Sequence, residues 1–258
     1  MPKNDPVQPK SRRRLFAWVI SLSVIAGFFA TVAAIGWPYY LEQRIVRNIE
    51  AGGGNVVRDR GGPDWLRRFM GNRPMQVFER VRRVNLTRTG VTDAGLARLG
   101  GFTNLQELSL DRTGITDSGL ALLNGLPNLI WLSLDGTSVT DAGLADLTGL
   151  TKFKVLSLGR TGITDSGLVP LQGLTKLEVL SLEETGITDA GLAHLSGLTN
   201  LEVLRLTATG VTDSGLAHLQ GLTNLKGLNL TGTGVTAHGV KAFRTALPAC
   251  RVYGWPDD

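Results

Sequence analysis

Six aspartates recur along the chain, each preceded by a threonine in the motif T-D-x-G-L. An aspartate beside a hydroxyl could serve in acid–base chemistry, but a catalytic acid is a single feature with an environment of its own. Here the pair returns at one fixed interval, as one position of a repeat architecture does. We therefore interpret these aspartates as structural and expect them to lie one above another on the outer side of a stacked fold. They are Asp93, Asp117, Asp141, Asp165, Asp189 and Asp213.

Other residue types that could do chemistry are sparse. His194 and His218 are separated by the same interval and should stack on neighbouring helices, but no cysteine or third histidine accompanies them, which favours a solvated pair over a metal site. Cys250 is the single cysteine, so it forms no intrachain disulfide and is expected to be buried as a small apolar residue. No Ser-His-Asp, Cys-His or H-E-x-x-H arrangement is present. The sequence predicts no enzyme, no metal and no cofactor.

Short apolar triplets with the pattern L-x-L recur at the same spacing as the aspartates. An unbroken period of roughly 20 to 29 residues around an L-x-x-L-x-L core is typical of a leucine-rich-repeat solenoid, in which each repeat adds one strand to a parallel sheet. The pattern predicts seven repeats, with Val252 at the next register position as a closing half-strand. The triplets begin at Val84, Leu108, Leu132, Leu156, Leu180, Leu204 and Leu228.

Alternation within each triplet assigns the faces of the predicted sheet. Leu108 and Leu110 should point into the core, whereas Glu107, Ser109 and Asp111 should point outward. A threonine follows each triplet where the strand turns away, and its hydroxyl is expected to bond a backbone group left unpaired there. These threonines are Thr89, Thr113, Thr137, Thr161, Thr185, Thr209 and Thr233.

Each T-D pair is expected to open a short helix, because threonine and aspartate side chains accept hydrogen bonds from the free amides of a first helical turn. The pattern does not decide which of the two is the cap. Gly119 and its equivalents remove a side chain at the helix start, which suggests close approach to the neighbouring coil. Pro170 predicts a turn or 3₁₀ segment in its repeat. A left-handed glycine is expected to end each helix, at Gly101, Gly125, Gly149, Gly173, Gly197 and Gly221.

An uncharged, mostly apolar run covers residues 15–37 and is long enough to span a bilayer. The basic residues Arg12, Arg13 and Arg14 precede it, which predicts a cytoplasmic N-terminus and places the rest of the chain outside the cytoplasm. A cleaved signal peptide is the competing interpretation, since Val32-Ala33-Ala34 resembles a weak cleavage site, although the run exceeds the usual apolar length of about 7 to 15 residues. A buried soluble helix is a third.

Residues 38–80 are expected to form a small α/β cap between this segment and the repeats. Apolar residues from Leu41 to Ile49 recur at helical spacing, glycines 52–54 end that helix, Val56 and Val57 suggest a short strand, and residues 63–66 begin another helix. The predicted organisation is a cytoplasmic tail (1–14), a transmembrane helix or signal anchor (15–37), a membrane-proximal basic cap (38–80), the repeats (81–248) and a C-terminal closing half-strand (249–258).

Positive charge concentrates in this cap region. Residues 41–88 carry eleven arginines against five acids, whereas residues 89–258 carry eleven bases against sixteen acids. The cluster is consistent with a solvated charged face, with contact to anionic lipid headgroups or wall polymers, or with nucleic-acid binding; the last has no recognisable module or aromatic platform to support it, and we expect no nucleic-acid partner. Residues for an anionic-surface contact would be Arg58, Arg60, Arg67, Arg68, Arg82 and Arg83.

The repeat frame L-x-x-L-x-L-x-x-T-x-[IV]-T-D-x-G-L, over about residues 81 to 253, resembles the ribonuclease-inhibitor-like class of leucine-rich repeats. This frame occurs in bacterial surface and secreted repeat proteins and in eukaryotic F-box repeat arms. The resemblance implies an α/β solenoid, a right-handed αβ horseshoe arc with a parallel concave sheet, that binds proteins and catalyses nothing. An F-box does not precede these repeats, which counts against a ubiquitin-ligase adaptor.

Outward strand positions mark where a partner could bind the concave sheet. A tryptophan next to three valines in one row suggests an exposed apolar contact patch; ordinary filling of strands by β-branched residues explains the valines equally well. Charged residues follow the strands. The predicted partner-binding residues are Trp131, Val155, Val179, Val203, Arg205, Asp111, Asp135, Glu183, Glu184, Arg112 and Arg160.

Two functions from different classes remain open. In the first, a monomeric, single-pass membrane protein displays its repeats in the periplasm or at the cell surface and binds another protein or a surface polymer. In the second, the repeats form an intracellular adaptor or substrate-recognition arm, with the apolar segment in the opposite orientation. Neither uses catalysis.

Overall fold

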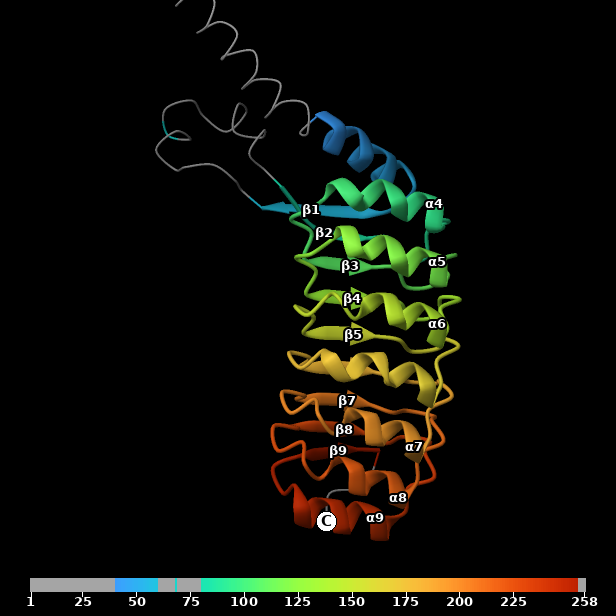
Figure 1. The fold of residues 1–258 in the computed structure, drawn as a ribbon, viewed down its shortest axis with the longest axis vertical. Helices are drawn as coiled ribbons and strands as arrows, with labels where there is room; N and C mark the ends of the chain where they lie inside the picture. The colour runs from blue at the N-terminus through green and yellow to red at the C-terminus, as the bar shows by residue number, and fades with distance from the viewer. Residues whose placement is uncertain (1–39, 60–67, 69–79, 255–258) are drawn as a thin grey trace, which may run out of the picture.

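The computed structural model describes residues 40–59, 68 and 80–254. In this part the chain winds into a stack of coils whose strands form one sheet, with each strand beside the next in sequence order (Figure 1). The strands are β1 (Asn55–Asp59), β2 (Arg80–Asn85), β3 (Glu107–Ser109), β4 (Trp131–Ser133), β5 (Val155–Ser157), β6 (Val179–Ser181), β7 (Val203–Arg205), β8 (Gly227–Asn229) and β9 (Arg251–Tyr253).

The pairing of β2 to β9 is parallel and follows the period of the sequence. Leu108 lies opposite Leu132, Leu132 opposite Leu156, and Leu228 opposite Val252. The predicted leucine triplets therefore stand side by side, and the closing strand at Val252 is confirmed. Among the described strands, β1 differs because it pairs antiparallel with β2. The repeat period does not predict this pairing, since β1 precedes the repeats.

Short helical segments line the other side of the coils (Figure 1). Five coils use a single α-helical turn, and all five continue as a 3₁₀ turn. Pro170 removes an amide that an α-helix would use, and its coil is 3₁₀ throughout, as predicted. The α-helical segments are α4 (Asp93–Leu96), α5 (Asp117–Leu120), α6 (Asp141–Leu144), α7 (Asp189–Leu192), α8 (Asp213–Leu216) and α9 (Ala237–Ala246). The 3₁₀ segments are η2 (Ala97–Gly101), η3 (Ala121–Gly125), η4 (Ala145–Leu147), η5 (Asp165–Leu168), η6 (Pro170–Gly173), η7 (Ala193–Leu195) and η8 (Ala217–Leu219).

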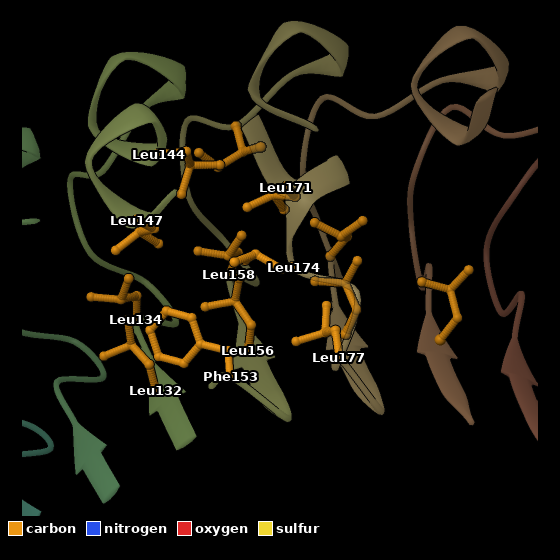
Figure 2. Close-up of a cluster of buried hydrophobic side chains, with 14 of the residues drawn as sticks. Leu132, Leu134, Leu144, Leu147, Phe153, Leu156, Leu158, Leu171, Leu174 and Leu177 are labelled. Carbon is orange, nitrogen blue, oxygen red and sulfur yellow. The ribbon is translucent and has the colours of Figure 1, made fainter. Parts of the chain in front are cut away.

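The core is a continuous column of leucines between the strands and these segments (Figure 2). Within one coil, Leu156 from β5, Leu158 just after β5 and Leu171 from the 3₁₀ turn belong to the same cluster, and Phe153 lies before the strand; all four are buried. Each leucine also packs on its equivalents above and below. Because an isolated coil would leave both sides of its core uncovered, stability comes from stacking between neighbours.

The predicted threonine ladder is confirmed. The Thr137 hydroxyl donates to the carbonyl oxygen of Leu134 at 2.7 Å, and the equivalent bond forms in every repeat, from Thr89 to Leu86 through Thr233 to Leu230. The hydroxyl thus satisfies the carbonyl of the last inward leucine, at the point where the chain leaves the sheet.

The prediction of left-handed glycines at the helix ends is wrong. Gly125 and its equivalents do not have positive φ, because the helical segments tighten into 3₁₀ turns that need no left-handed stop. The left-handed position lies instead in the turn that follows each strand, and most of its residues have side chains. It is occupied by Arg88, Arg112, Gly136, Arg160, Glu184, Ala208 and Gly232, with φ between 52° and 73°.

The N-terminal end of the described stack begins with a helix over residues 40–51. Val46 and Ile49 on this helix are buried against the first coil, in agreement with the helical spacing, and Gly53 turns the chain into β1 with φ 85°. None of the helices in the described ranges has the length and apolar character needed to cross a bilayer. The predicted membrane segment (15–37), the tail before it and the helix expected at 63–66 lie outside those ranges.

The C-terminal end is closed by α9, a ten-residue helix in place of the short turns of the other coils. The motif T-D-x-G-L is broken here, with Ala237 in the aspartate position. Val240 and Phe243 on this helix, together with Cys250 after it, are buried against the last leucines. An altered terminal repeat that covers the core is what an array of dependent coils requires.

Candidate functional site

The recurring aspartates tie adjacent coils together. Asp189 accepts two hydrogen bonds from the next coil: one from the Thr212 amide at 2.7 Å and one from the Thr212 hydroxyl at 2.6 Å. Threonine occupies the N-cap position of each of these helical segments, but its hydroxyl accepts from its own helix only in α7, α8 and α9. The aspartate side chain reaches out of its own coil, so the expectation of a side-chain cap in every first turn is confirmed for those three threonines and wrong for the aspartates. The pairs are Asp93–Thr116, Asp117–Thr140, Asp141–Thr164, Asp165–Thr188, Asp189–Thr212 and Asp213–Thr236.

The glycine of the T-D-x-G-L motif makes room for this bond. A Cβ on Gly143 would lie 2.5 Å from Asp117 Oδ1 and 3.0 Å from Asp117 Cα, which is a steric clash. The predicted close approach of the neighbouring coil is therefore confirmed. Both carboxylate oxygens of each aspartate accept from the neighbouring threonine, so this row ties adjacent coils together.

The predicted apolar row crosses the sheet at the first position of each strand. Trp131 pairs with Val155, Val155 with Val179, and Val179 with Val203, so the four side chains are neighbours on the outward face of the sheet, which the resemblance predicts to be concave and which we call the concave face. Adjacent strands lie about 4.8 Å apart, which makes the row a continuous stripe. All four are partly exposed. We call these four residues the apolar stripe.

The next row is mostly serine and is less accessible than the pattern suggested. Ser109, Ser133 and Ser181 are only 5, 3 and 3% exposed. Ser157 Oγ donates to Asp135 Oδ1 of the preceding coil at 2.6 Å, and the Gly159 amide donates to the same oxygen at 2.8 Å.

Asp111 bonds its neighbours in the same way as Asp135. It accepts from Ser133 in the following coil and, at 3.2 Å, from the Asp135 amide. Two of the predicted partner-binding residues, Asp111 and Asp135, are thus engaged in bonds between coils.

Charged residues of the predicted site stand on the turn after the strands. Arg112, Arg160 and Glu184 occupy the left-handed position, and Arg160 pairs with Glu184 of the next coil at 2.7 Å. The hydrogen bond from Arg160 lowers the pKa of the Glu184 carboxyl and raises that of the guanidinium. Glu183 is partly exposed beside this pair. The ion pair is exposed, so it contributes little to stability.

The basic residues near the N-terminal end are largely paired. Arg82 bonds Asp59 at 3.1 Å and Gln106 at 2.7 Å, Arg83 pairs with Glu107, and Arg58 donates to Gln43 at 3.1 Å. The remaining predicted contact residues are placed as follows: Arg68 is exposed, and Arg60 and Arg67 lie outside the described ranges.

Nothing in the described ranges gathers three or more potential metal ligands. His194 Nδ1 is 2.8 Å from Gln172 Nε2 of the preceding coil, and the two histidines sit on the outer turns as expected. Cys250 is buried, as predicted, and burial raises the pKa of its thiol to about 11, so the reactive thiolate is rare at neutral pH.

A hollow at the C-terminal end of the concave face was not predicted. It has a volume of about 410 Å³ and is lined by residues of the last three strands. Tyr253 and Gly227 belong to it, and the sequence carried a signal for both, because glycine interrupts the valine row and Tyr253 occupies the serine row. The lining residues are Val203, Leu204, Arg205, Lys226, Gly227, Asn229 and Tyr253.

Comparisons with known proteins identify the repeats. A family model described as "Leucine Rich repeat" matches residues 103–123, 149–171 and 173–196. No curated protein matches the chain. Repeats of the leucine-rich kind are therefore present, and the finer assignment to the ribonuclease-inhibitor-like class stays a prediction.

Solved structures of bacterial repeat proteins are similar to this chain. An internalin (InlF) from Listeria monocytogenes is similar at 23% identity and a TM-score of 0.54, over 68% of this chain and 54% of that one. The chain thus spans about half of that structure. An internalin C2 from the same species is similar at 25% identity and a TM-score of 0.47, over 67% of this chain and 80% of that one. A leucine-rich-repeat protein from Leptospira interrogans is similar at 22% identity and a TM-score of 0.47, over 60% of this chain and 38% of that one. At this identity the first similarity establishes the fold alone.

Proposed function

We propose that this leucine-rich-repeat protein is a binding protein without catalytic activity, and that it holds another protein or a surface polymer against the concave face of its sheet. The apolar stripe carries this proposal. Stacking of strands forces Trp131 and three valines into one contiguous, partly exposed row, and such a row on an otherwise polar face is typical of an interaction site. Tryptophan is also a frequent hot-spot residue.

The polar groups of the scaffold support a binding role over a catalytic one. The outer aspartates each accept two hydrogen bonds from the next coil, and Asp111 and Asp135 bond the coil that follows them. A general acid or base needs a proton-accepting group free to meet a substrate. The concave face instead presents side chains suited to contact.

We further propose that residues 15–37 anchor the protein in a membrane, with the N-terminus in the cytoplasm and the repeats in the periplasm or at the cell surface. The basic residues before this run and its length support the orientation. Protease treatment of intact cells, and of spheroplasts where an outer membrane is present, tests it. Digestion of the repeats is expected, and protection in both preparations would refute this orientation in favour of an intracellular adaptor.

The binding face can be tested in the full-length chain. Partners are first labelled by a proximity-labelling enzyme fused on the side of the repeats and identified, and each is then tested for capture by purified protein. We expect Trp131→Ser/Val155→Ser to reduce capture at least tenfold. Leu122→Ser/Val169→Ser is the matched control, because it removes two apolar side chains that are 39 and 48% exposed on the outer segments.

Circular dichroism of both double variants checks that the repeats remain folded. Retention of the same partner by the Trp131→Ser/Val155→Ser protein would show that the apolar stripe is not the binding face. Equal loss in the control variant would show that capture reports general surface apolarity.

A further inference from the structure

The sequence shared by β5 and β6 changes in the last three strands, and the changed positions lie next to one another. Strands β5 and β6 both read Val-Leu-Ser. In β7 the serine becomes Arg205, in β8 the valine becomes Gly227 and the serine Asn229, and β9 ends in Tyr253. Parallel pairing places Arg205 next to Asn229 and Asn229 next to Tyr253. The departures therefore form one contiguous surface.

Loss of the side chain at position 227 opens the hollow that these residues line. A Cβ added to Gly227 would find the Tyr253 ring 3.4 Å away and Val203 3.9 Å away, which is ordinary contact, so the glycine is not required by packing. Tyr253 is 47% exposed, and the Arg251 guanidinium lies 5.1 Å from its ring centroid. The base of the hollow is thus apolar and partly aromatic.

The walls of the hollow carry unused hydrogen-bond donors. Arg205 is exposed and forms no ion pair within the described ranges, whereas Ser109, Ser133 and Ser181 at the same position of other coils are buried. Asn229 Oδ1 accepts from the Thr231 amide at 3.0 Å and from its hydroxyl at 2.8 Å, which orients the amide group and leaves its NH₂ available. A guanidinium and an amide next to each other are a natural receptor for a carboxylate.

The charges around the hollow favour the same ligand. Lys226 pairs with Glu202 at 2.7 Å, so these two residues balance each other, and Arg205 and Arg251 remain. Glu183 is the acidic residue that the repeat pattern would pair with Arg205. Asp135 accepts from Ser157 of the following coil, and Glu183 and Arg205 occupy the equivalent positions two coils later. Glu183 nevertheless forms no ion pair with Arg205 in the described structure, and the hollow keeps a net positive charge.

We infer that this hollow binds an extended protein segment that places an Asp or Glu side chain against Arg205 and Asn229 and an adjacent apolar side chain over Val203, Gly227 and Tyr253. The inference rests on the proposed function, since the hollow continues the apolar stripe, which ends at Val203. It adds a preference for acidic partners that the stripe alone does not have.

The test uses a displayed library of random peptides selected against the purified full-length chain. We expect enrichment of peptides that contain an acidic residue next to a large apolar one. Synthetic copies should lose at least tenfold in affinity for Arg205→Ser and for Gly227→Val. Both substitutions restore the residue used by other coils, so they remove the guanidinium or fill the hollow without disturbing the fold. Arg98→Ser is the matched control, because it removes one exposed positive charge from an outer segment.

Peptide analogues identify the recognised group. Replacement of the acidic residue by Asn or Gln should weaken binding to the same extent as Arg205→Ser, and amidation of the peptide C-terminus should have no effect. Sensitivity to amidation alone would overturn the inference in favour of a terminal carboxylate. Absence of acidic peptides among the selected sequences, or equal binding to Arg205→Ser, would overturn it as well.

The outcome also separates this inference from the proposed function. Peptides that lose affinity for Trp131→Ser but not for Arg205→Ser would refute the acidic subsite and leave the concave binding face intact. Peptides that bind all concave variants as well as the unaltered chain would refute both.

Discussion

The outer row of aspartates and the concave rows differ in how their residues vary along the array. The outer row is the same residue in six successive coils, and each member makes the same two bonds to the following threonine. The concave rows are less uniform, because Trp131, Arg205 and Gly227 interrupt their runs of valine and serine, and Arg205 stands exposed. The uniform outer row holds neighbours together, whereas the concave rows, in which repeated valines are joined by single residues such as Trp131 and Arg205, face solvent and the proposed partner.

The largest effect is expected from removal of an outer aspartate in the middle of the array. Asp141→Ala deletes a charged acceptor and leaves the Thr164 amide and hydroxyl without their partner. We expect the free energy of unfolding to fall by about 3 kcal/mol, measured by urea denaturation. Asp146→Ala, on the next segment of the same coil, is the control and should change it by less than about 0.5 kcal/mol. Equal losses would contradict the assignment of the outer row as the tie between coils.

A somewhat smaller loss is expected from crowding the same bond. A Cβ on Gly167 would clash with Asp141 Oδ1 and lie 3.0 Å from Ile163 Cγ2. Gly167→Ala should therefore cost about 1–3 kcal/mol. Combined with Asp141→Ala it should cost less than the sum of the two, since the carboxylate no longer needs the space. Gly173→Ala, where nothing lies within 4 Å, should not destabilise. Strict additivity of the pair would refute the steric link.

A pH dependence follows from the last tie of the outer row. Hydrogen bonds from the Thr236 side chain and amide lower the pKa of Asp213 below its ordinary 3.8 in the folded state, and His238 adds to this. The stabilisation is therefore complete above about pH 4 and is lost as the pH falls through the lowered pKa. Urea denaturation at pH 6 and pH 3 should show a smaller difference for Asp213→Asn than for the unaltered protein. An unchanged difference would contradict this.

The smallest effect is expected on the concave face. Arg205→Ser removes an exposed side chain that bonds nothing in the described ranges, so the free energy of unfolding should change by less than about 0.5 kcal/mol, even though ligand binding should fall. Urea denaturation measures this against Asp141→Ala. A destabilisation comparable to that of Asp141→Ala would show that the varied concave residues also support the fold.

Periodicity in the sequence predicted the coil and its register, because a strand position that returns at a fixed interval can satisfy its leucines only by stacking. It also placed the threonine ladder and the 3₁₀ turn at Pro170. Sequence spacing did not reveal that Asp141 bonds Thr164 of the next coil. In the sequence Asp141 stands beside Thr140 and Thr164 beside Asp165, so the motif suggests contacts within a coil. The left-handed residues were also not predicted, because positive φ is expected for glycine, asparagine or aspartate and not for arginines such as Arg112 and Arg160.

The sequence predicted where the residues of the candidate site lie on the sheet, but not which of them are buried or hydrogen-bonded. The register gave the apolar stripe correctly, but it could not show that Ser133 is buried or that Asp135 is engaged by Ser157, since both depend on side-chain geometry between coils. The hollow at Gly227 exists because this position lacks the valine side chain of other coils. The repeat pattern describes which residues recur, so it does not predict a feature that depends on a single departure.

The fixed reach of the outer aspartates bears on how such a protein can change in length. Each carboxylate meets a threonine 23 positions further along. Excision of residues 142–165 would leave Asp141 at that same separation from Thr188, and the junction would have the same partners as every other. Duplication of such a block is equally neutral for the contacts. Recombination within the gene could therefore lengthen or shorten the concave surface one strand at a time, and leave both end caps as they are.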